Sequence, residues 1–282
     1  FSRLGEIEKA LEYVGKDTDL IRFLGCKIFV DGAFAAGQAW TSWKNKQGNN
    51  GLYYVYNDDS FGSEYNLNRI VEKLEELGLN CHYHIQGDQG IETLLNALDA
   101  VKAKNGALKC VHTIIHVAFP RKDQIERMKK FGGHLVTTVQ PGFWEVEDDM
   151  QYYYGDNAAL AYPVKDLIDA GISTGISTDF SVSPVELSPP QTIMKTAVTG
   201  GGHPEIHKPL SVKEVVCGLS KASAATTAAR DTGTLKRGNK ADMVIFERDF
   251  HQIPAEKLSI DNPKVLSTWV SGRKVYDAGA KK

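Results

Sequence analysis

The feature that most constrains the fold of this chain is a regular alternation of helical and strand-like segments. Apolar residues at helical spacing fill segments such as 66–78, and that segment leads into the short apolar run CHYHI at 81–85. Strands that are almost continuously apolar and are joined by helices are typical of a parallel sheet covered by helices. We therefore expect an α/β fold over most of the chain.

The alternation can be followed through five strand segments. Helical patterns are predicted at 6–15, 66–78, 91–104, 122–133 and 163–171. Apolar strand patterns are predicted at 26–32, 79–88, 110–118, 134–142 and 172–179. After these, helical stretches at 189–199 and 211–230 precede β-like segments at 241–247 and 265–279. The last two segments predict a small separate sheet.

Length, composition and charge narrow the class of protein. The 282 residues suffice for one large barrel-like domain or two ordinary ones. Hydrophobic residues at 42% and charged residues at 24% are typical of a soluble globular protein, and a net charge of −2 gives no basic field for nucleic acid. No apolar run is long enough to cross a bilayer, and the first 15 residues lack the apolar core of a signal peptide. Because the chain does not begin with Met, we expect a mature, trimmed or partial chain.

The cysteines are isolated from one another. Cys26, Cys81, Cys110 and Cys217 each lie in an apolar stretch and form no C-x-x-C motif. This pattern predicts buried free thiols rather than disulfides. Free thiols favour a reducing compartment, so we expect a cytoplasmic location.

Polar side chains end successive predicted strands. In chain order these ends carry 27–31, 84–88, His116, Gln140 and Asp179. Chemistry in a parallel α/β barrel is placed at the carboxyl ends of the strands. Neutral imidazole and carboxylate are ligands that suit zinc. The order of these residues therefore predicts a metal site distributed around a barrel.

Each candidate also has an ordinary structural interpretation. The stretch CHYHIQGD could supply a His-x-His ligand pair, a single ligand with a neighbour, or an ordinary strand. Lys27 could be a surface lysine, or burial could lower the pKa of its amine so that it adds carbon dioxide and becomes a carbamate ligand. A strand histidine such as His84 or His116 is often a hydrogen-bonded core residue, and Asp179 could cap a turn.

Six segments together resemble the amidohydrolase superfamily, specifically its family-3 branch of YtcJ-like hydrolases: KIFVDGAFAAGQA, HIQGD, IIHVA, VQPGFW, GISTGISTDFSVSP and GTLKRGNKADMVIF. The resemblance runs from about residue 20 to the end of the chain. It implies a TIM-like (β/α)8 metallo-dependent hydrolase barrel, with strands 4 to 8 represented here. The barrel portion would span 1–232, and 233–282 would add the C-terminal strands of a small β-sandwich.

The resemblance also implies roles for individual residues. The metal ligands would be Lys27 as the carboxylated lysine of strand 4, His84 of strand 5, His116 of strand 6 and Asp179 of strand 8. They would hold one or two zinc-like divalent ions, and carbon dioxide would be needed to carboxylate the lysine. Asp179 would also be the catalytic residue that passes a proton from the attacking water to the leaving amine. Asp31, His82, Asp88 and Gln140 would surround the ligands. Separately from the resemblance, the loops that carry Trp40, Phe143 and Trp144 are expected to line the substrate pocket, with packing of the loops as the alternative.

The family pattern places a His-x-His pair on strand 1, yet none occurs before Lys27. Only three further strands follow CHYHI up to Asp179, too few to complete eight if CHYHI were the first. We therefore expect a missing N-terminal segment or a second chain to complete the barrel. An unpaired apolar sheet edge favours association, so a homo-oligomer is a further expectation.

The expected function is hydrolysis of amide-type, non-peptide C–N bonds in a small-molecule substrate by a metal-activated water. One alternative is a catalytically inactive remnant or binding protein on the same scaffold. The other is a deaminase or lactonase of the same superfamily, because metal hydroxide attacks amide, amidine and ester with the same groups. Nucleic-acid and membrane partners are not expected.

Overall fold

The computed structural model of the chain describes residues 3–18, 21–180, 182, 185, 189–258 and 263–279, without the side chains of 146–149. The chain divides into two compact units. The first comprises 1–139 and 147–173, and the second comprises 140–146 and 174–282. Each unit is described by itself below, and the division into 1–232 and 233–282 stays a prediction.

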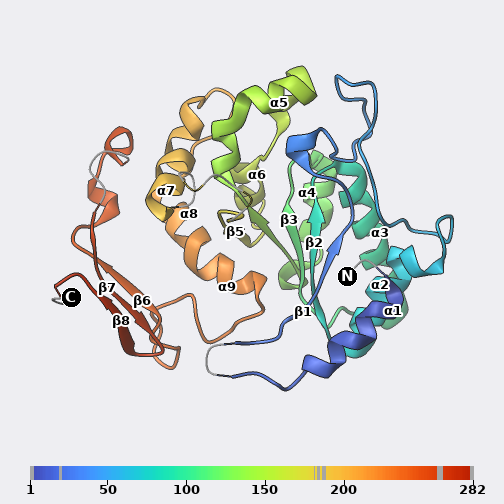
Figure 1. Ribbon diagram of the computed structural model, residues 1–282, viewed down its shortest axis with the longest axis horizontal. Coiled ribbons are helices and arrows are strands. Elements are labelled where there is room, and N and C mark those ends of the chain that lie inside the picture. The colour runs from blue at the N-terminus through green and yellow to red at the C-terminus, as the bar shows by residue number, and fades with distance from the viewer. Residues whose placement is uncertain are drawn as a thin grey trace. The chain divides into compact units, whose positions relative to one another are not determined.

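The first unit is built on a parallel sheet whose strands follow one another in chain order (Figure 1). Its strands are β1 (Gly25–Phe29), β2 (Asn80–Ile85), β3 (His112–His116) and β4 (Leu135–Val139). Its helices are α1 (Leu4–Ile7), α2 (Leu67–Leu77), α3 (Asp88–Asn105), α4 (Lys122–Lys129), α5 (Glu147–Tyr154) and α6 (Val164–Asp169). The parallel sheet with helical connections confirms the predicted α/β architecture.

Helix α2 shows how the local sequence fixes these elements. The side chain of Asn66 accepts hydrogen bonds from the backbone N–H groups of residues 68 and 69, which caps the first turn. Gly78 ends the helix in the left-handed region, with φ of 70°. Between these caps, Ile70 and Leu74 are fully buried, so the apolar stripe of the helix faces the core.

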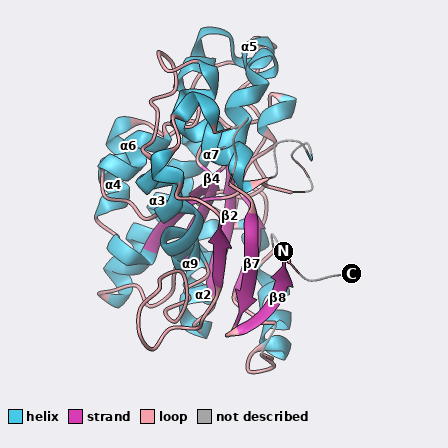
Figure 2. Cartoon of the chain, turned by 90° about the vertical axis from the view of Figure 1, so that its left-hand side faces the viewer, coloured by secondary structure: helices cyan, strands magenta, loops and turns pink. Residues whose placement is uncertain are grey.

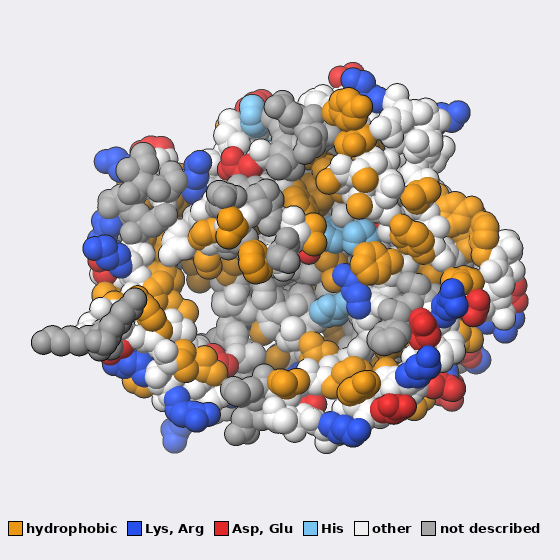
Figure 3. All heavy atoms as spheres, in the orientation of Figure 1, with side chains coloured by type: hydrophobic (Ala, Val, Ile, Leu, Met, Phe, Trp, Pro, Cys, Tyr) orange, Lys and Arg blue, Asp and Glu red, His pale blue; other side chains and the backbone are white. Residues whose placement is uncertain are grey.

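The two faces of the sheet differ in exposure. On one face, Ile28, Tyr83 and Ile114 are fully buried. On the other face, Lys27 is half-buried and Phe29 is 46% exposed. Figure 3 shows hydrophobic, basic and histidine side chains at the surface over the position of β1 in Figure 1. The face that carries Lys27 is therefore accessible to solvent around β1.

The second unit begins with strand β5 (Thr174–Ile176) and continues with helices α7 (Pro190–Thr199), α8 (Val212–Cys217) and α9 (Ser223–Thr226). A π-helical turn at Gly218–Ala222 separates α8 from α9, so the stretch predicted as one helix at 211–230 is divided. Strands β6 (Met243–Phe246), β7 (Val265–Val270) and β8 (Arg273–Asp277) form an antiparallel sheet, and Figure 2 shows β7 beside β8. This confirms the small C-terminal sheet.

The four cysteines are free. Cys26, Cys81 and Cys110 are buried as predicted, whereas Cys217 is exposed, because its position in α8 faces solvent. The expectation of a buried thiol was therefore wrong for Cys217. Among the described residues, no helix combines the length and apolarity needed to cross a membrane.

Candidate metal centre

Two of the predicted ligands lie at the carboxyl ends of neighbouring parallel strands. His84 is the fifth residue of β2, and His116 is the last residue of β3. In the register of the sheet, His116 pairs with Ile85 rather than with His84. Paired positions of neighbouring strands share a face, so regular strand geometry would direct the His116 side chain away from His84.

The backbone of His116 departs from strand geometry and brings the two rings together. The φ angle is 83° at His116 and 54° at Val117. This left-handed conformation costs a residue with a side chain roughly 1–2 kcal/mol. As a result, Nε2 of His116 lies 3.0 Å from Nδ1 of His84, and the ring centroids are 4.5 Å apart. The hydrogen bond from Val117 N–H to the Ile85 carbonyl, 3.0 Å long, helps to hold the turn.

The paired imidazoles have the chemistry and spacing of metal ligands. His84 is 8% exposed and His116 is 3% exposed. Two nitrogens bound to one tetrahedral zinc at about 2 Å are about 3.3 Å apart, close to the observed separation. Nε2 of His84 lies 3.3 Å from the carbonyl oxygen of Gly32, a contact that can fix the ring tautomer and leave Nδ1 as the metal ligand.

No group of three His, Cys, Asp or Glu side chains among the described residues could hold a metal ion. Within the described residues, the histidine pair would need at least one further ligand to hold a metal ion. Lys27 lies on the same face of β1 as Phe29, whose ring stacks on His84 with centroids 4.8 Å apart. The Lys27 Nζ atom is 5.1 Å from the centroid of the Phe29 ring. The Phe29 ring thus lies next to both the predicted lysine ligand and His84 of the histidine pair.

Asp31 joins the ends of two strands to a loop. Its fully buried carboxylate accepts backbone hydrogen bonds from Gln86 (2.8 Å), Gly87 (2.7 Å) and Trp40 (3.1 Å). Burial raises the pKa of Asp31 to about 8, while the N–H groups of Gly87, Gln86 and Trp40 act in the opposite direction. This side chain fixes the backbone around the histidine pair.

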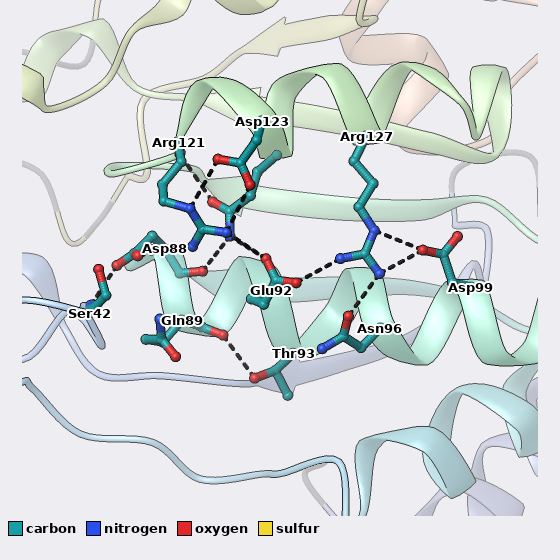
Figure 4. A network of polar contacts seen from close by, with 11 residues as sticks. Ser42, Asp88, Gln89, Glu92, Thr93, Asn96, Asp99, Arg121, Asp123 and Arg127 are labelled. Carbon is teal, nitrogen blue, oxygen red and sulfur yellow. Dashed lines mark hydrogen bonds and ion pairs between the residues drawn. The ribbon is translucent and has the colours of Figure 1, made fainter.

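Asp88 of the HIQGD segment lies in a network of polar contacts between α3 and α4 (Figure 4). The carboxylate is 2% exposed and accepts hydrogen bonds from the Ser42 N–H (2.8 Å) and the Arg121 guanidinium (3.1 Å). Arg121 also forms an ion pair with Glu92 at 2.7 Å. Asp88 therefore holds the start of α3 and the neighbouring loop.

The other predicted residues of the first unit lie around these groups. His82 is half-buried and occupies the same face of β2 as His84, two residues earlier. The Trp40 ring packs on two loop tyrosines, with centroid distances of 4.6 Å to Tyr53 and 5.5 Å to Tyr56. Trp40 is 9% exposed, so its ring is packed into the loop.

Asp179 and Gln140 belong to the second unit. Asp179 follows β5, is half-buried and has a positive φ of 56°. Gln140 is 1% exposed and donates a hydrogen bond from its side-chain amide to the Ser177 hydroxyl at 2.8 Å. The convergence of Asp179 with His84 and His116 around one cation stays a prediction.

The two predicted aromatic residues of the second unit lie in a 3-10 helix at Pro141–Val146. Trp144 is 1% exposed and stacks on His207, with centroids 4.9 Å apart and an interplanar angle of 9°. Phe143 is half-buried. Burial of His207 lowers its pKa to about 4, so the imidazole in this stack is neutral near pH 7.

Sequence reasoning missed a further buried histidine, His112, on the opposite face of the sheet from His84. His112 is hydrogen-bonded through Nδ1 to the Tyr83 hydroxyl (2.9 Å) and through Nε2 to the Glu75 carboxylate (3.0 Å). All three side chains are fully buried. The available signal was Glu75, an acidic residue beside Leu74 on the apolar stripe of α2.

The family model described as the amidohydrolase family matches residues 3–276. The chain belongs to the amidohydrolase family. This amidohydrolase chain is 25% identical over 283 residues to the N-substituted formamide deformylase of Arthrobacter pascens, covering 97% of this chain and 49% of the relative. It is also 25% identical over 271 residues to YtcJ of Bacillus subtilis strain 168, covering 91% of this chain and 48% of that relative. The predicted YtcJ-like resemblance is confirmed.

Solved structures of metal-dependent hydrolases are similar to this amidohydrolase. The match to a hydrolase of Pyrococcus horikoshii OT3 has a TM-score of 0.71 at 25% identity and covers 88% of this chain and 50% of that one. The match to a hydrolase of Pyrococcus furiosus has a TM-score of 0.69 at 25% identity and covers 84% and 47%. The chain thus spans about half the length of the relatives it matches.

Proposed function

We propose that this amidohydrolase chain carries part of the centre of a metal-dependent hydrolase that cleaves amide-type, non-peptide C–N bonds in a small molecule. The observation that carries the proposal is the buried contact between the His84 and His116 imidazoles at the carboxyl ends of adjacent parallel strands. The Arthrobacter relative, named as a deformylase of N-substituted formamides, supports the type of bond. The Pyrococcus neighbours, named as metal-dependent, support the use of a metal.

The metal, one or two zinc-like ions, would be held by His84, His116 and a carboxylated Lys27. When bound, such an ion lowers the pKa of a coordinated water and polarises the substrate carbonyl. The Lys27 amine would form its N–C bond to carbon dioxide and release one proton, giving a carbamate with two ligand oxygens. The half-buried position of Lys27 on the face of His84 supports this role.

Asp179 is the proposed proton carrier of the reaction. Its carboxylate would accept the proton of the attacking water and then deliver it to the leaving amine as the C–N bond breaks. Its place shortly after β5, with a left-handed φ of 56°, supports this role.

A metal assay tests the proposal directly. We expect zinc in the purified protein by elemental analysis, and an intact mass that includes one added carbon dioxide under native conditions. The His84→Gln variant should lose the zinc because one imidazole ligand is removed, whereas His251→Gln changes a half-exposed surface histidine and should keep it. Zinc content that is the same in wild type and His84→Gln would contradict the proposed centre.

The proposed complete protein includes further polypeptide next to β1. Within the described strands, β1 stands at the start of the sheet order and pairs with β2 on one side. The missing N-terminal segment or a second chain, including another copy of this one, would cover that edge and the exposed face. Buried free thiols at Cys26, Cys81 and Cys110 support the further proposal of a cytoplasmic location.

A further inference from the structure

Tyr162 lies in the first unit, shortly before α6, and is 1% exposed. Its backbone is left-handed, with φ of 53°, which is unfavourable for a residue that has a Cβ atom. A residue keeps such a conformation only where the surrounding contacts hold it. The contacts of Tyr162 reach both strands that carry the candidate histidine ligands.

The backbone of Tyr162 is bonded to the turn that follows His116. Its N–H donates to the Ala118 carbonyl at 2.7 Å, two residues after the histidine. The next residue of the same turn is bonded to the end of β2, because the Phe119 N–H donates to the Gln86 carbonyl at 2.8 Å. Two different parts of the chain therefore hold the turn that contains the left-handed His116.

The side chain of Tyr162 is bonded to the segment that follows His84. Its ring packs edge-on against Phe34, with centroids 5.1 Å apart, and its hydroxyl donates to Oε1 of Gln86 at 3.2 Å. Gln86 is 3% exposed, and its backbone N–H donates to the Asp31 carboxylate at 2.8 Å. Tyr162 thus contacts the chain two residues after each histidine of the pair.

We propose that Tyr162 is a positioning residue of the candidate metal centre. By joining Ala118 to Gln86, it holds the two imidazoles at the separation of ligands of one ion. Nε2 of His116 approaches Nδ1 of His84 to 3.0 Å only because the backbone at 116–117 is left-handed. Residues that orient metal ligands change metal affinity without touching the ion. The role rests on the proposed function, because it concerns ligands of the proposed metal.

The test is the Tyr162→Phe variant, which removes the hydroxyl and keeps the ring and the backbone N–H. Nuclear magnetic resonance of the metal-free full chain, labelled with ¹⁵N in its histidines, reports the environment of the ring nitrogens. We expect the ring signals of His84 and His116 to shift, because the end of β2 is released from Tyr162. Zinc affinity, measured by competition with a chelator, should fall about tenfold.

Tyr154→Phe is the matched control. Tyr154 is 3% exposed, and its hydroxyl donates at 2.8 Å to the carbonyl of Phe34, whose ring also contacts Tyr162. Loss of this buried hydrogen bond should lower the free energy of unfolding, as in Tyr162→Phe. The control should nevertheless keep the wild-type ring signals of both histidines and the wild-type zinc affinity.

The Gln86→Leu variant completes the series, because it removes the acceptor instead of the donor. It should weaken zinc binding by a similar factor, and adding Tyr162→Phe to it should weaken binding little further. Unchanged histidine signals in Tyr162→Phe, or equal shifts in Tyr162→Phe and Tyr154→Phe, would overturn the role of Tyr162. Absence of zinc binding by the wild type would instead contradict the metal centre, and the metal-free signals would still decide whether Tyr162 holds the imidazole pair.

Discussion

His116 shows how one residue can decide the geometry of a site. A strand residue at its position would share the face of Ile85, and the left-handed turn at 116–117 directs the ring to His84 instead. The turn is made by two residues with side chains, one of them β-branched, where glycine would be the usual choice. The backbone is therefore held in a costly conformation at the point where the two imidazoles meet.

Substitutions at His116 should separate the backbone requirement from the chemical one. Asparagine adopts the left-handed region readily, so His116→Asn should lose zinc with a modest loss of stability. Valine does not, so His116→Val should be less stable than His116→Asn by roughly 1–2 kcal/mol. Chemical denaturation of both variants, with zinc analysis of each, checks this expectation. Equal stability of the two variants would show that the turn is not under backbone constraint.

The candidate site could be predicted from the sequence only in part. Polar residues at the ends of apolar strands singled out His84 and His116, because their positions follow from the strand pattern alone. The contact between them could not be predicted, since it depends on φ angles that no periodicity encodes. The same holds for Phe29, whose stacking on His84 comes from register between β1 and β2.

At the scale of elements, a buried hydrogen-bonded chain ties helix α2 to strand β3. Glu75 on α2 contacts His112 on β3, and also accepts backbone hydrogen bonds from Lys109 (2.8 Å) and Cys110 (3.0 Å) at the entry to that strand. Burial alone would raise the pKa of Glu75, but the bonds from His112, Lys109 and Cys110 lower it from 4.5 to about 2. The carboxylate therefore stays ionised in the folded protein under mildly acidic conditions.

This lowered pKa predicts a pH dependence of stability. The folded state holds the Glu75 proton more weakly than the unfolded state, so the stabilisation is present above pH 4.5 and is lost as the pH falls to about 2. The total loss from this group is about 3 kcal/mol. Urea denaturation at a series of pH values measures it, and Glu75→Gln should flatten the decline in this window.

The same series needs a surface control. Glu126→Gln removes an exposed carboxylate that pairs with Lys129 at 2.9 Å on α4. It should change the free energy of unfolding by less than about 0.5 kcal/mol at neutral pH. If Glu75→Gln retains the wild-type decline between pH 4.5 and 2, the α2–β3 contact is not its cause.

The elements themselves could be predicted well because periodicity is a local property. The segment 66–78 became α2 at Leu67–Leu77, and the apolar run at 110–118 became β3 at His112–His116. The stretch 211–230 is interrupted by a π-helical turn at Gly218–Ala222, which the helical periodicity of the sequence does not indicate. Glu75 lay on a predicted helix. Its partner His112 is distant in sequence, so their contact could be recognised only in the folded structure.

At the scale of the whole molecule, β1 stands at one end of the order of the parallel sheet, with β2 as its described neighbour on one side. The edge of a sheet can pair with a further strand, and the adjoining face of β1 carries Phe29 at 46% exposure. Such a surface favours further polypeptide. The chain spans about half the length of these relatives, which agrees with the proposal of further polypeptide at this edge.

Hydrogen exchange at β1 tests whether that surface is covered. In the metal-loaded protein we expect the amides of 25–29 to be protected, and sedimentation velocity to show either a longer polypeptide or an assembly of chains. Protection should fall when the assembly is diluted to single chains. Rapid exchange at β1 in a metal-loaded single chain would contradict a covered edge.

The glycine–aspartate pair after His84 has a consequence for how members of this family are recognised. A methyl group added at Gly87 would lie 1.8 Å from the Trp40 carbonyl oxygen, and the Asp88 carboxylate is occupied by Ser42 and Arg121. The folded chain therefore requires both motif residues, whether or not the protein catalyses hydrolysis. A family member that had lost hydrolytic activity would still retain Gly87 and Asp88. A search for active enzymes should therefore give more weight to the imidazoles of His84 and His116 than to this glycine–aspartate pair.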